Sequence, residues 1–357
     1  MDPAALRASF PVFERASFLN AGSDGPTPAA AGDAVREVMD RAVVEGRRIE
    51  HFKAREDVSD ALRMLYAGRL GADRADVSLT TSTSEGLGKV VTGLGLGAGD
   101  EVLTADGEHP GLLGPLMAAR ARGATIRTGP LTSLADHVTD ATTLVACSHV
   151  GWVSGELADP RLGQTGVPLV LDGAQGVGAV PTDVAALGCA AYAGAGQKWL
   201  CGADGTGMLW LDPEFGARVH AGAPPYGAFA DSSLGLESAL HTDGRAHDTP
   251  SLALELLVAS VAAGQVLEAF GWDALLARAT DLAARFASAL ADAGYVVGPR
   301  GDTTLVSWED PNSAQTASQL AQKGVILRNL PATPYVRASV GAWNDETDLD
   351  RLLEALK

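Results

Sequence analysis

The residues best suited to chemistry are an acidic side chain and a lysine that follows it in the chain. Asp172 ends the apolar run PLVLD, and Lys198 lies in a glycine-rich stretch beside Trp199. A lysine amine can form an imine with an aldehyde cofactor and later move protons, while a carboxylate facing a pyridine nitrogen keeps that ring protonated. The pair therefore suits pyridoxal 5'-phosphate (PLP). Taken alone, an aspartate at a strand end is usually a helix cap or a solvated loop residue, and a lone lysine is usually an ordinary loop residue. The prediction therefore depends on the combination of Asp172 and Lys198.

Short apolar runs between helical patterns predict the framework that positions this pair. Runs of this length, separated by helices, are typical of a mainly parallel sheet that is covered on both faces. Such sheets bind ligands beyond the carboxyl ends of their strands, where Asp172 is expected. The candidate strands are residues 77–80, 101–105, 125–129, 143–148, 168–172 and 207–211.

The rest of the chain predicts a smaller α+β domain. A long apolar helical pattern over 251–270 is expected to link the two parts. The sequence thus predicts an α/β protein with an N-terminal arm joining the small domain (1–19), a large cofactor-binding domain (20–250), and the linking helix with the small domain (251–357). The small domain is expected to contain helices at 272–290 and 313–323, strands at 295–298, 304–309 and 324–328, and a closing helix capped by Asn344 or Asp345.

Composition limits the possible partners. Asp and Glu number 44 against 27 Lys and Arg, and the net charge of -17 would repel nucleic acid and anionic membrane surfaces. Neither an apolar run of about 20 residues nor a basic and apolar leader is found, which predicts a cytoplasmic protein. The three cysteines form no C-x-x-C pair, so we expect reduced thiols and no metal site.

The stretch around the pair resembles a known family. It reads D-G-A-Q at 172–175, G-Q-K at 196–198 and a glycine-rich run at 202–207. This pattern resembles the class V aminotransferases, which include cysteine desulfurases, selenocysteine lyases and isopenicillin N epimerase. The resemblance extends over nearly the whole chain. It implies the PLP-dependent transferase fold (fold type I) with a seven-stranded type of sheet, PLP linked to Lys198, and Asp172 at the ring nitrogen.

The resemblance also implies further cofactor contacts. The turn TTSTSEG (80–86) matches the segment that holds the cofactor phosphate at a helix N-terminus, although by itself it is equally a capping box. The segment AHDTP (246–250) resembles a G-T-P motif that reaches the partner subunit's phosphate, which implies a homodimer. The implied ligands are Thr83 and Ser84 for the phosphate, His109 stacked on the ring, Gln175 near the phenolic oxygen, Gln197 near the phosphate, and Thr249 in trans.

Substrate contacts are implied at both ends of the chain. FLNAGSDGPTP (18–28) is similar to the opening segment that shapes the pocket and includes Asn20. Arg337, in an R-A-S context that suggests a strand end, would clamp the substrate carboxylate with its planar guanidinium, and Arg328 is a second candidate. Trp152 lies at or near the position of an asparagine that touches the cofactor in many relatives.

A second departure from the family bears on the reaction. Desulfurases carry a mobile loop with a nucleophilic cysteine between the two C-terminal arginines, but the interval here is NLPATPYV. We therefore expect no catalytic cysteine. Reaction through a Lys198 aldimine and a quinonoid then favours β-elimination from a small amino acid, as in a carbon-sulfur lyase, with epimerisation and transamination as alternatives.

The sequence argues against two other classes of protein. A non-catalytic binding protein of this fold would have been indicated by loss of Lys198 or Asp172, and both are present. A dinucleotide-binding oxidoreductase would need G-x-G-x-x-G after a strand, whereas GLGLGAG (93–99) lacks that spacing and precedes one.

Overall fold

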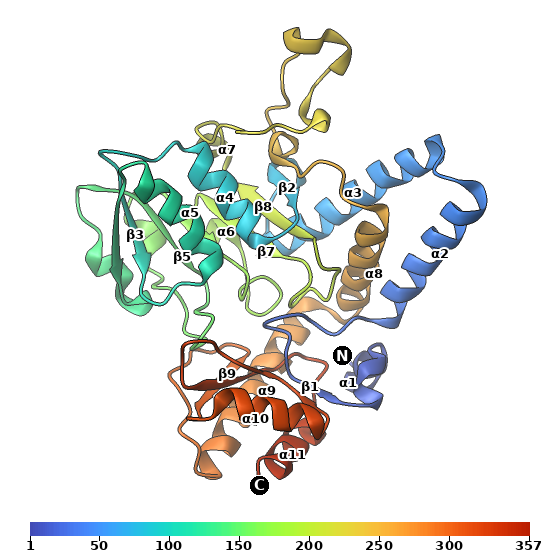
Figure 1. The fold of residues 1–357 in the computed structure, drawn as a ribbon, viewed down its shortest axis with the longest axis vertical. Coiled ribbons are helices and arrows are strands. Elements are labelled where there is room, and N and C mark those ends of the chain that lie inside the picture. Colours follow the sequence, from blue (N-terminus) through green and yellow to red (C-terminus); the bar gives the residue numbers. More distant parts are fainter.

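The computed structural model describes residues 1–357, and its centre is a seven-stranded sheet in the order β2-β8-β7-β6-β5-β3-β4 (Figure 1). Only β8 runs antiparallel to its neighbours, so the predicted mainly parallel α/β sheet is confirmed. The strands are β2 (Val77–Thr80), β3 (Glu101–Ala105), β4 (Thr125–Gly129), β5 (Thr142–Ser148), β6 (Leu169–Asp172), β7 (Ala191–Ala195) and β8 (Gly207–Leu211).

Strand β7 is the central strand that the sequence did not predict. Its residues AYAGA are mostly alanine and glycine, which have low strand propensity and form no apolar run. All five residues are nevertheless buried, because β7 lies within the sheet between β6 and β8 and α4 packs against one of its faces. The strand directly precedes the Lys198 loop, so it fixes where the lysine lies.

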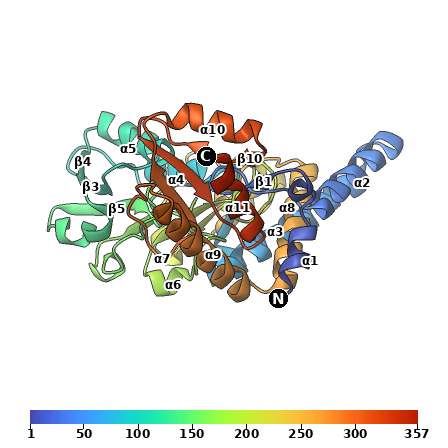
Figure 2. The same cartoon turned by 90° about the horizontal axis from the view of Figure 1, so that it is seen from below.

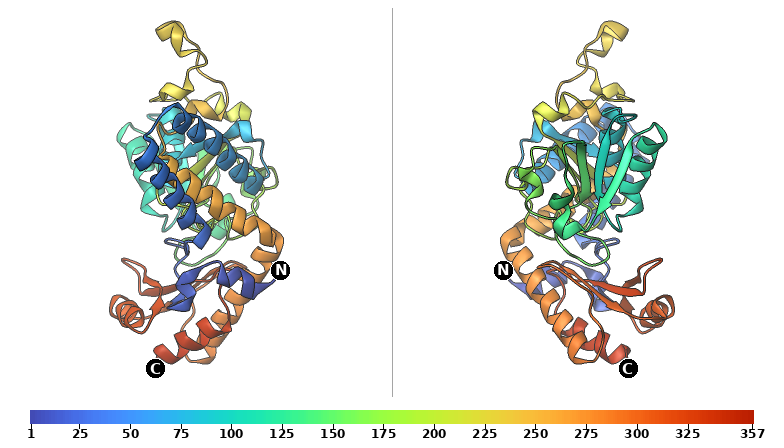
Figure 3. Two further views of the ribbon diagram at one scale, coloured as in Figure 1. Left: turned by 90° about the vertical axis from the view of Figure 1, so that its right-hand side faces the viewer. Right: turned by 90° about the vertical axis from the view of Figure 1, so that its left-hand side faces the viewer.

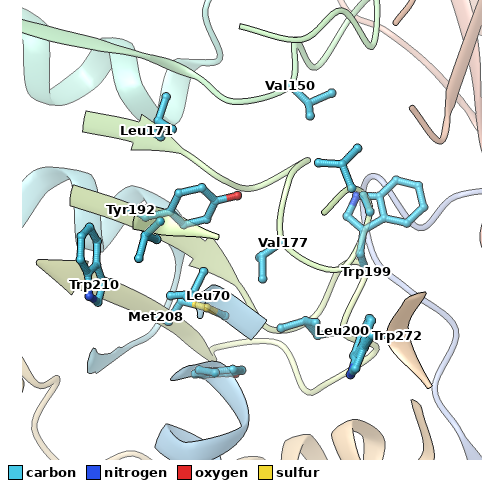
Figure 4. Close-up of a cluster of buried hydrophobic side chains, with 14 of the residues drawn as sticks. Leu70, Val150, Leu171, Val177, Tyr192, Trp199, Leu200, Met208, Trp210 and Trp272 are labelled. Atoms are coloured by element: carbon cyan, nitrogen blue, oxygen red, sulfur yellow. The ribbon is translucent and has the colours of Figure 1, made fainter. Parts of the chain in front are cut away.

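Helices cover both faces of the sheet (Figures 1 and 3). On one face α4 (Thr83–Gly93) and α5 (Pro110–Ala121) bury leucine and valine side chains against the strands. On the other, the end of α3 (Ile49–Leu70) and α8 (Leu254–Phe270) contribute to the largest core cluster. Part of this cluster, with Tyr192, Trp199 and Met208, is seen in Figure 4. Two short helices complete this part, α6 (Val184–Leu187) and α7 (Pro213–Gly216).

A helical hairpin that the sequence did not predict projects from the large domain. Helix α2 (Ala29–Glu45) packs along α8 and continues through a turn into α3 (Figure 1). Side chains at its tip include the exposed Val43, Val44 and Ile49. Helix α8 begins at Leu254 and not at residue 251, and it meets α9 (Trp272–Asp292) at a bend of 84°. No single helix is long and apolar enough to cross a membrane.

The small domain is a three-stranded antiparallel sheet with helices against it (Figure 2). The predicted strand at 295–298 is wrong, because that segment forms only one bridge, Val297 with Trp308. The predicted strand at 324–328 divides at Leu327 into two short strands in different sheets. The elements are β9 (Leu305–Glu309), α10 (Ser313–Gln322), β10 (Val325–Ile326), β11 (Arg328–Asn329), β12 (Tyr335–Ser339) and α11 (Glu346–Ala355), whose N-cap is Asp345.

The N-terminal arm lies against the small domain. Strand β1 (Ser17–Phe18) pairs in parallel with β10, and α1 (Pro3–Ala8) carries Arg7, which binds Asp348 of α11 at 2.7 Å. The side chain of Asp348 is completely buried, so this ion pair fixes the arm more firmly than an exposed pair would. The chain therefore passes from the small domain to the mouth of the large one before α2 begins. The domain limits at residues 20 and 250 remain a prediction.

Candidate active site

Asp172 and Lys198 lie at the same edge of the sheet, the edge at which the sequence predicted Asp172. Asp172 ends β6 and Lys198 follows the adjacent β7. Asp172 is 4% exposed, and burial raises the pKa of its carboxyl, although nearby Lys198 and His109 oppose the shift. Burial also lowers the pKa of Lys198 to about 8. The two side chains form no salt bridge, but they lie close enough for the charge of each to shift the pKa of the other.

The opening segment predicted to shape the pocket packs on the lysine loop. The Gly25 N–H donates to the carbonyl of Gln197 at 2.7 Å, and a side chain at residue 25 would collide with the carbonyl of Lys198. Asp24 lies close enough to Lys198 and Asp204 for their charges to affect its pKa, which burial raises. Asp24 is thus a further polar residue at the mouth of the site, and no local sequence pattern indicated it.

His109 and Trp152 form one wall of the site. His109 caps α5, where its Nδ1 accepts a hydrogen bond from the Gly111 N–H at 3.0 Å. The Trp152 ring lies edge-on to it, with 5.2 Å between ring centroids, and its indole N–H donates to the Gly107 carbonyl. Burial, followed by the charge of Lys198, lowers the pKa of His109, so a neutral imidazole faces the site. A neutral ring suits the predicted stacking on a protonated pyridine.

Gln175 is held in one orientation. Its Nε2 donates to the Gly22 carbonyl at 2.7 Å, and its Oε1 accepts from the Trp199 indole at 3.0 Å. Trp199 itself is part of the core cluster (Figure 4). One N–H of the Gln175 amide remains free, which is what a contact to the phenolic oxygen of a cofactor requires.

The first turn of α4 has the features of an anion site. Ser82 is the N-cap, so the backbone N–H groups of Thr83 and Ser84 have no partner within the helix. Thr83 is 5% exposed, yet its hydroxyl has no hydrogen-bond partner, and the same is true of the buried Gln197 Oε1. Unpaired buried polar atoms are costly, and a phosphate at this helix end would accept from the hydroxyl and the amides. The residues present therefore fit PLP.

Arg337 is a buried cation without a carboxylate partner. The sequence suggested a strand end, but Arg337 lies within β12 and is 1% exposed, because β12 is the central strand of its sheet. Its Nη1 donates to the Trp152 carbonyl at 2.5 Å, and its Nε has no partner. Burial and the nearby Arg328 lower its pKa to about 9. Such a group favours an anionic ligand.

Further unpaired atoms surround this guanidinium. Ser339 is fully buried with a free hydroxyl, and Asn20, which bridges to Ser339, has a buried Oδ1 without a partner. Gly22 makes room for the side chains of Arg337 and Ser339, since a Cβ at residue 22 would be 2.7 Å from Arg337 Nη2 and from Ser339 Oγ. Arg328 donates to Ser23 at 3.1 Å. The four predicted substrate contacts, Asn20, Trp152, Arg328 and Arg337, thus lie together at the junction of the two domains.

The sequence also missed a buried acid behind His109. Glu108 accepts from the N–H and the hydroxyl of Ser148, at 2.8 and 2.5 Å, and Ser148 pairs with Asp172 in the sheet. Burial raises the pKa of Glu108 to about 7, and hydrogen bonds from Ser148 limit that rise. Glu108 directly precedes His109 in the sequence, but its hydrogen-bond partner Ser148 lies on β5, forty residues later.

Thr249 is bound within its own subunit. Its N–H donates to the Leu79 carbonyl at 2.7 Å and its hydroxyl to Glu85 at 2.5 Å. Its predicted contact with the phosphate of a partner subunit remains a prediction.

Comparison with known proteins agrees with this geometry. The profile described as aminotransferase class-V matches residues 23–352, so the chain belongs to the class-V aminotransferase family and is a PLP-dependent enzyme. The chain is 28% identical over 394 residues to an isopenicillin N epimerase of Amycolatopsis lactamdurans, covering 95% of this chain and 94% of that protein.

Two other matches are informative. A probable cysteine desulfurase of Aeropyrum pernix is 32% identical over 229 residues, covering 57% of this chain and only 54% of that protein. A solved structure of a cystine C-S lyase with its product, cysteine persulfide, superposes with a TM-score of 0.91 at 23% identity, covering 97% of this chain and 98% of that chain. That likeness establishes the fold, PLP-dependent fold type I.

The unpaired guanidinium gives a test of substrate binding. We expect Arg337→Ala to raise KM for the substrate about 100-fold, because two charge-assisted hydrogen bonds to a carboxylate would be lost. Cofactor absorbance should stay normal. Arg285→Ala, which removes an exposed ion pair between α9 and α11, is the matched control and should leave KM unchanged. A normal KM in Arg337→Ala would remove Arg337 from the substrate site.

Proposed function

We propose that the enzyme catalyses β-elimination from a small amino acid that carries a sulfur leaving group. The observation that carries the proposal is the state of the cysteines. Cys147, Cys189 and Cys201 are all buried, and burial raises the pKa of each thiol. A sulfur-accepting thiolate must be exposed and mobile, so these residues are poor acceptors. Elimination needs a leaving group but no acceptor.

The residues support this reaction in distinct roles. Bound PLP supplies an electron sink for the pair left when a bond to the substrate α-carbon breaks. Arg337 binds the substrate carboxylate and so orients the α-carbon. Lys198, with a pKa of about 8, takes the α-proton on Nζ when neutral and can return a proton to the departing sulfur. Asp172 would place its negative charge at the ring nitrogen of bound PLP, and His109 would cover the ring face.

Epimerisation is the second candidate, supported by the full-length similarity to an isopenicillin N epimerase. The experiment that separates the reactions is incubation of the holoenzyme with a panel of amino acids and thioether conjugates. Formation of pyruvate and ammonia would support elimination. Racemised substrate would support epimerisation, and pyridoxamine phosphate would support transamination. Elimination products from no member of the panel, with racemisation of one, would overturn the proposal.

The cysteine argument predicts that turnover survives without any thiol. We expect the variant with Cys147, Cys189 and Cys201 replaced by Ala or Ser to keep kcat within about threefold of the wild type, since the thiols are buried and inert. Cys201 is the critical position, because it lies three residues after Lys198 in a left-handed conformation, with φ of 55°. If Cys201→Ser alone ended turnover with an unchanged cofactor spectrum, the enzyme would be a desulfurase with a relocated nucleophile.

The assembly that we propose is a homodimer. The exposed apolar residues at the tip of the α2–α3 hairpin and the projecting 221–246 segment are surfaces that a second copy would cover (Figure 1). Sedimentation of the holoenzyme tests this proposal, and a monomer at micromolar concentration would contradict it.

A further inference from the structure

The segment before α8 is attached to the sheet by an aspartate that the family motif does not contain. Where the G-T-P motif has glycine, this chain has Asp248. Its carboxylate binds both terminal nitrogens of Arg63 on α3, at 2.8 and 3.1 Å, and accepts from the Leu79 N–H at 2.8 Å. Arg63 is itself buried and also donates to the Val77 carbonyl. Asp248 thus connects α3 to β2, the strand that leads into α4.

The next residue extends this connection to α4. Thr249 uses both of its donors within the subunit, one on β2 and one on Glu85 in the first turn of α4. Lys89, one turn further along α4, donates to the carbonyls of His247 and Asp248 at 2.7 and 3.2 Å and lies 3.0 Å from Glu85. The 247–249 segment is therefore held against α4 by two charged side chains of that helix, Lys89 and Glu85.

Glu85 connects Thr249 to the turn that precedes the amino end of α4. Its Oε2 accepts from the N–H and the hydroxyl of Thr81, at 2.7 and 2.6 Å, while its own N–H donates to Ser82. Burial alone would raise the pKa of Glu85, but the hydrogen bonds from Thr249, Thr81 and Lys89 outweigh it and hold the pKa at about 2. Glu85 is therefore a fixed anion that orders the turn just before the free amides of Thr83 and Ser84.

We propose that Asp248 and Thr249 form an intrasubunit brace that positions the amino end of α4 for the cofactor phosphate. The proposal rests on the assignment of Thr83 and Ser84 as phosphate ligands. Asp248 and Thr249 are positioning residues for the phosphate site of their own subunit, since they contact β2, α3 and Glu85 and act on that site through the helix end. The brace should therefore matter for ligands that carry a phosphate and not for those that lack one.

Ligand truncation separates this role from a general structural one. Apo-enzyme is titrated with PLP and with pyridoxal, which lacks only the phosphate, and the dissociation constants are compared. Asp248→Asn should weaken PLP binding about tenfold or more, because a charged partner of three donors is lost, while pyridoxal binding stays within about twofold. Thr249→Val, which keeps side-chain size, should act in the same direction. Asp243→Ala, which removes the more exposed Asp243–Arg245 pair nearby, is the matched control.

The outcomes are distinct. Equal weakening of PLP and pyridoxal, or no change in either, in both Asp248→Asn and Thr249→Val would overturn the brace. Replacing Thr83 and Ser84 with Val and Ala tests the phosphate site itself. If that variant lost its preference for PLP and the Asp248 and Thr249 variants kept theirs, only the brace would be wrong; if it kept the preference in full, the hydroxyls of Thr83 and Ser84 would not be phosphate ligands.

Hybrid dimers test whether the brace acts within one subunit. One subunit carries Lys198→Ala and the other Asp248→Asn, so that only the second has an intact lysine. We expect this intact-lysine site to bind PLP as weakly as the Asp248→Asn homodimer. Wild-type affinity there would mean that the segment serves the partner's phosphate and would overturn the intrasubunit brace.

Discussion

Lys198→Ala is expected to abolish covalent attachment of PLP and to reduce turnover by about 1,000-fold or more, since a positioned proton-transfer group alone contributes 10²–10⁴-fold. The amine is buried next to Asp172 and His109, and burial has already lowered its pKa to about 8, which favours the nucleophilic neutral form. Absorbance of the purified variant with added PLP measures attachment, and a coupled product assay measures turnover.

The control is Lys323→Ala. That ammonium is exposed and donates to the Ala355 carbonyl in the small domain, so its loss should change neither quantity. Added primary amines should restore part of the Lys198→Ala activity, because a free amine can replace the missing proton carrier. Substantial turnover in Lys198→Ala without such amines would mean that another group moves the proton.

Asp172→Asn is expected to lower kcat by about 100-fold or more, the loss typical of removing one preorganised electrostatic group. The amide keeps the size of the carboxylate but carries no charge to keep the ring nitrogen protonated. Some PLP should remain bound, because the contacts of Gln175 and the first turn of α4 are independent of residue 172. Asp136→Asn, in an exposed ion pair with Arg161, is the matched control.

The apo-enzyme gives a second measurement on Asp172. Burial raises the folded-state pKa of its carboxyl, so at neutral pH the ionised form costs folding free energy in the absence of the cofactor. The Asp172→Asn apo-protein should therefore melt no lower than the wild type, while the increase in Tm on adding PLP should be smaller. A kcat close to that of the wild type, with an unchanged PLP-induced shift in Tm, would show that Asp172 does not face the ring.

The sequence predicted those features that depend on local pattern. The apolar run ending at Asp172 and the glycine-rich stretch around Lys198 carry their own signals, so the two residues could be paired as candidates and Asp172 could be placed at the end of a parallel strand. Strand β7 could not be predicted, because alanine and glycine become strand residues here only through pairing with β6 and β8 inside the sheet. The short strands β10 and β11 form because β1 and β12 pair with them, and no local sequence pattern predicts this pairing.

Contacts between distant segments explain what the sequence missed in the site. Gly22 and Ser339 are separated by more than 300 residues, and only the folded chain shows that Gly22 makes room for Ser339 and Arg337. Ser339 could have been found from strand alternation, because it is two residues from Arg337 and faces the same side. Asp248 lies in a G-T-P-like motif in the sequence, but its binding to Arg63 depends on the folded position of α3.

Borohydride reduction of the holoenzyme, followed by peptide mapping, tests most directly the claim that this chain carries PLP on one particular lysine. The chain has five lysines, the others being Lys53, Lys89, Lys323 and Lys357. We predict that the reduced cofactor is found on Lys198 alone, in one copy per chain. Labelling of Lys89, which lies in the predicted phosphate helix, or of any other lysine in place of Lys198 would contradict the account.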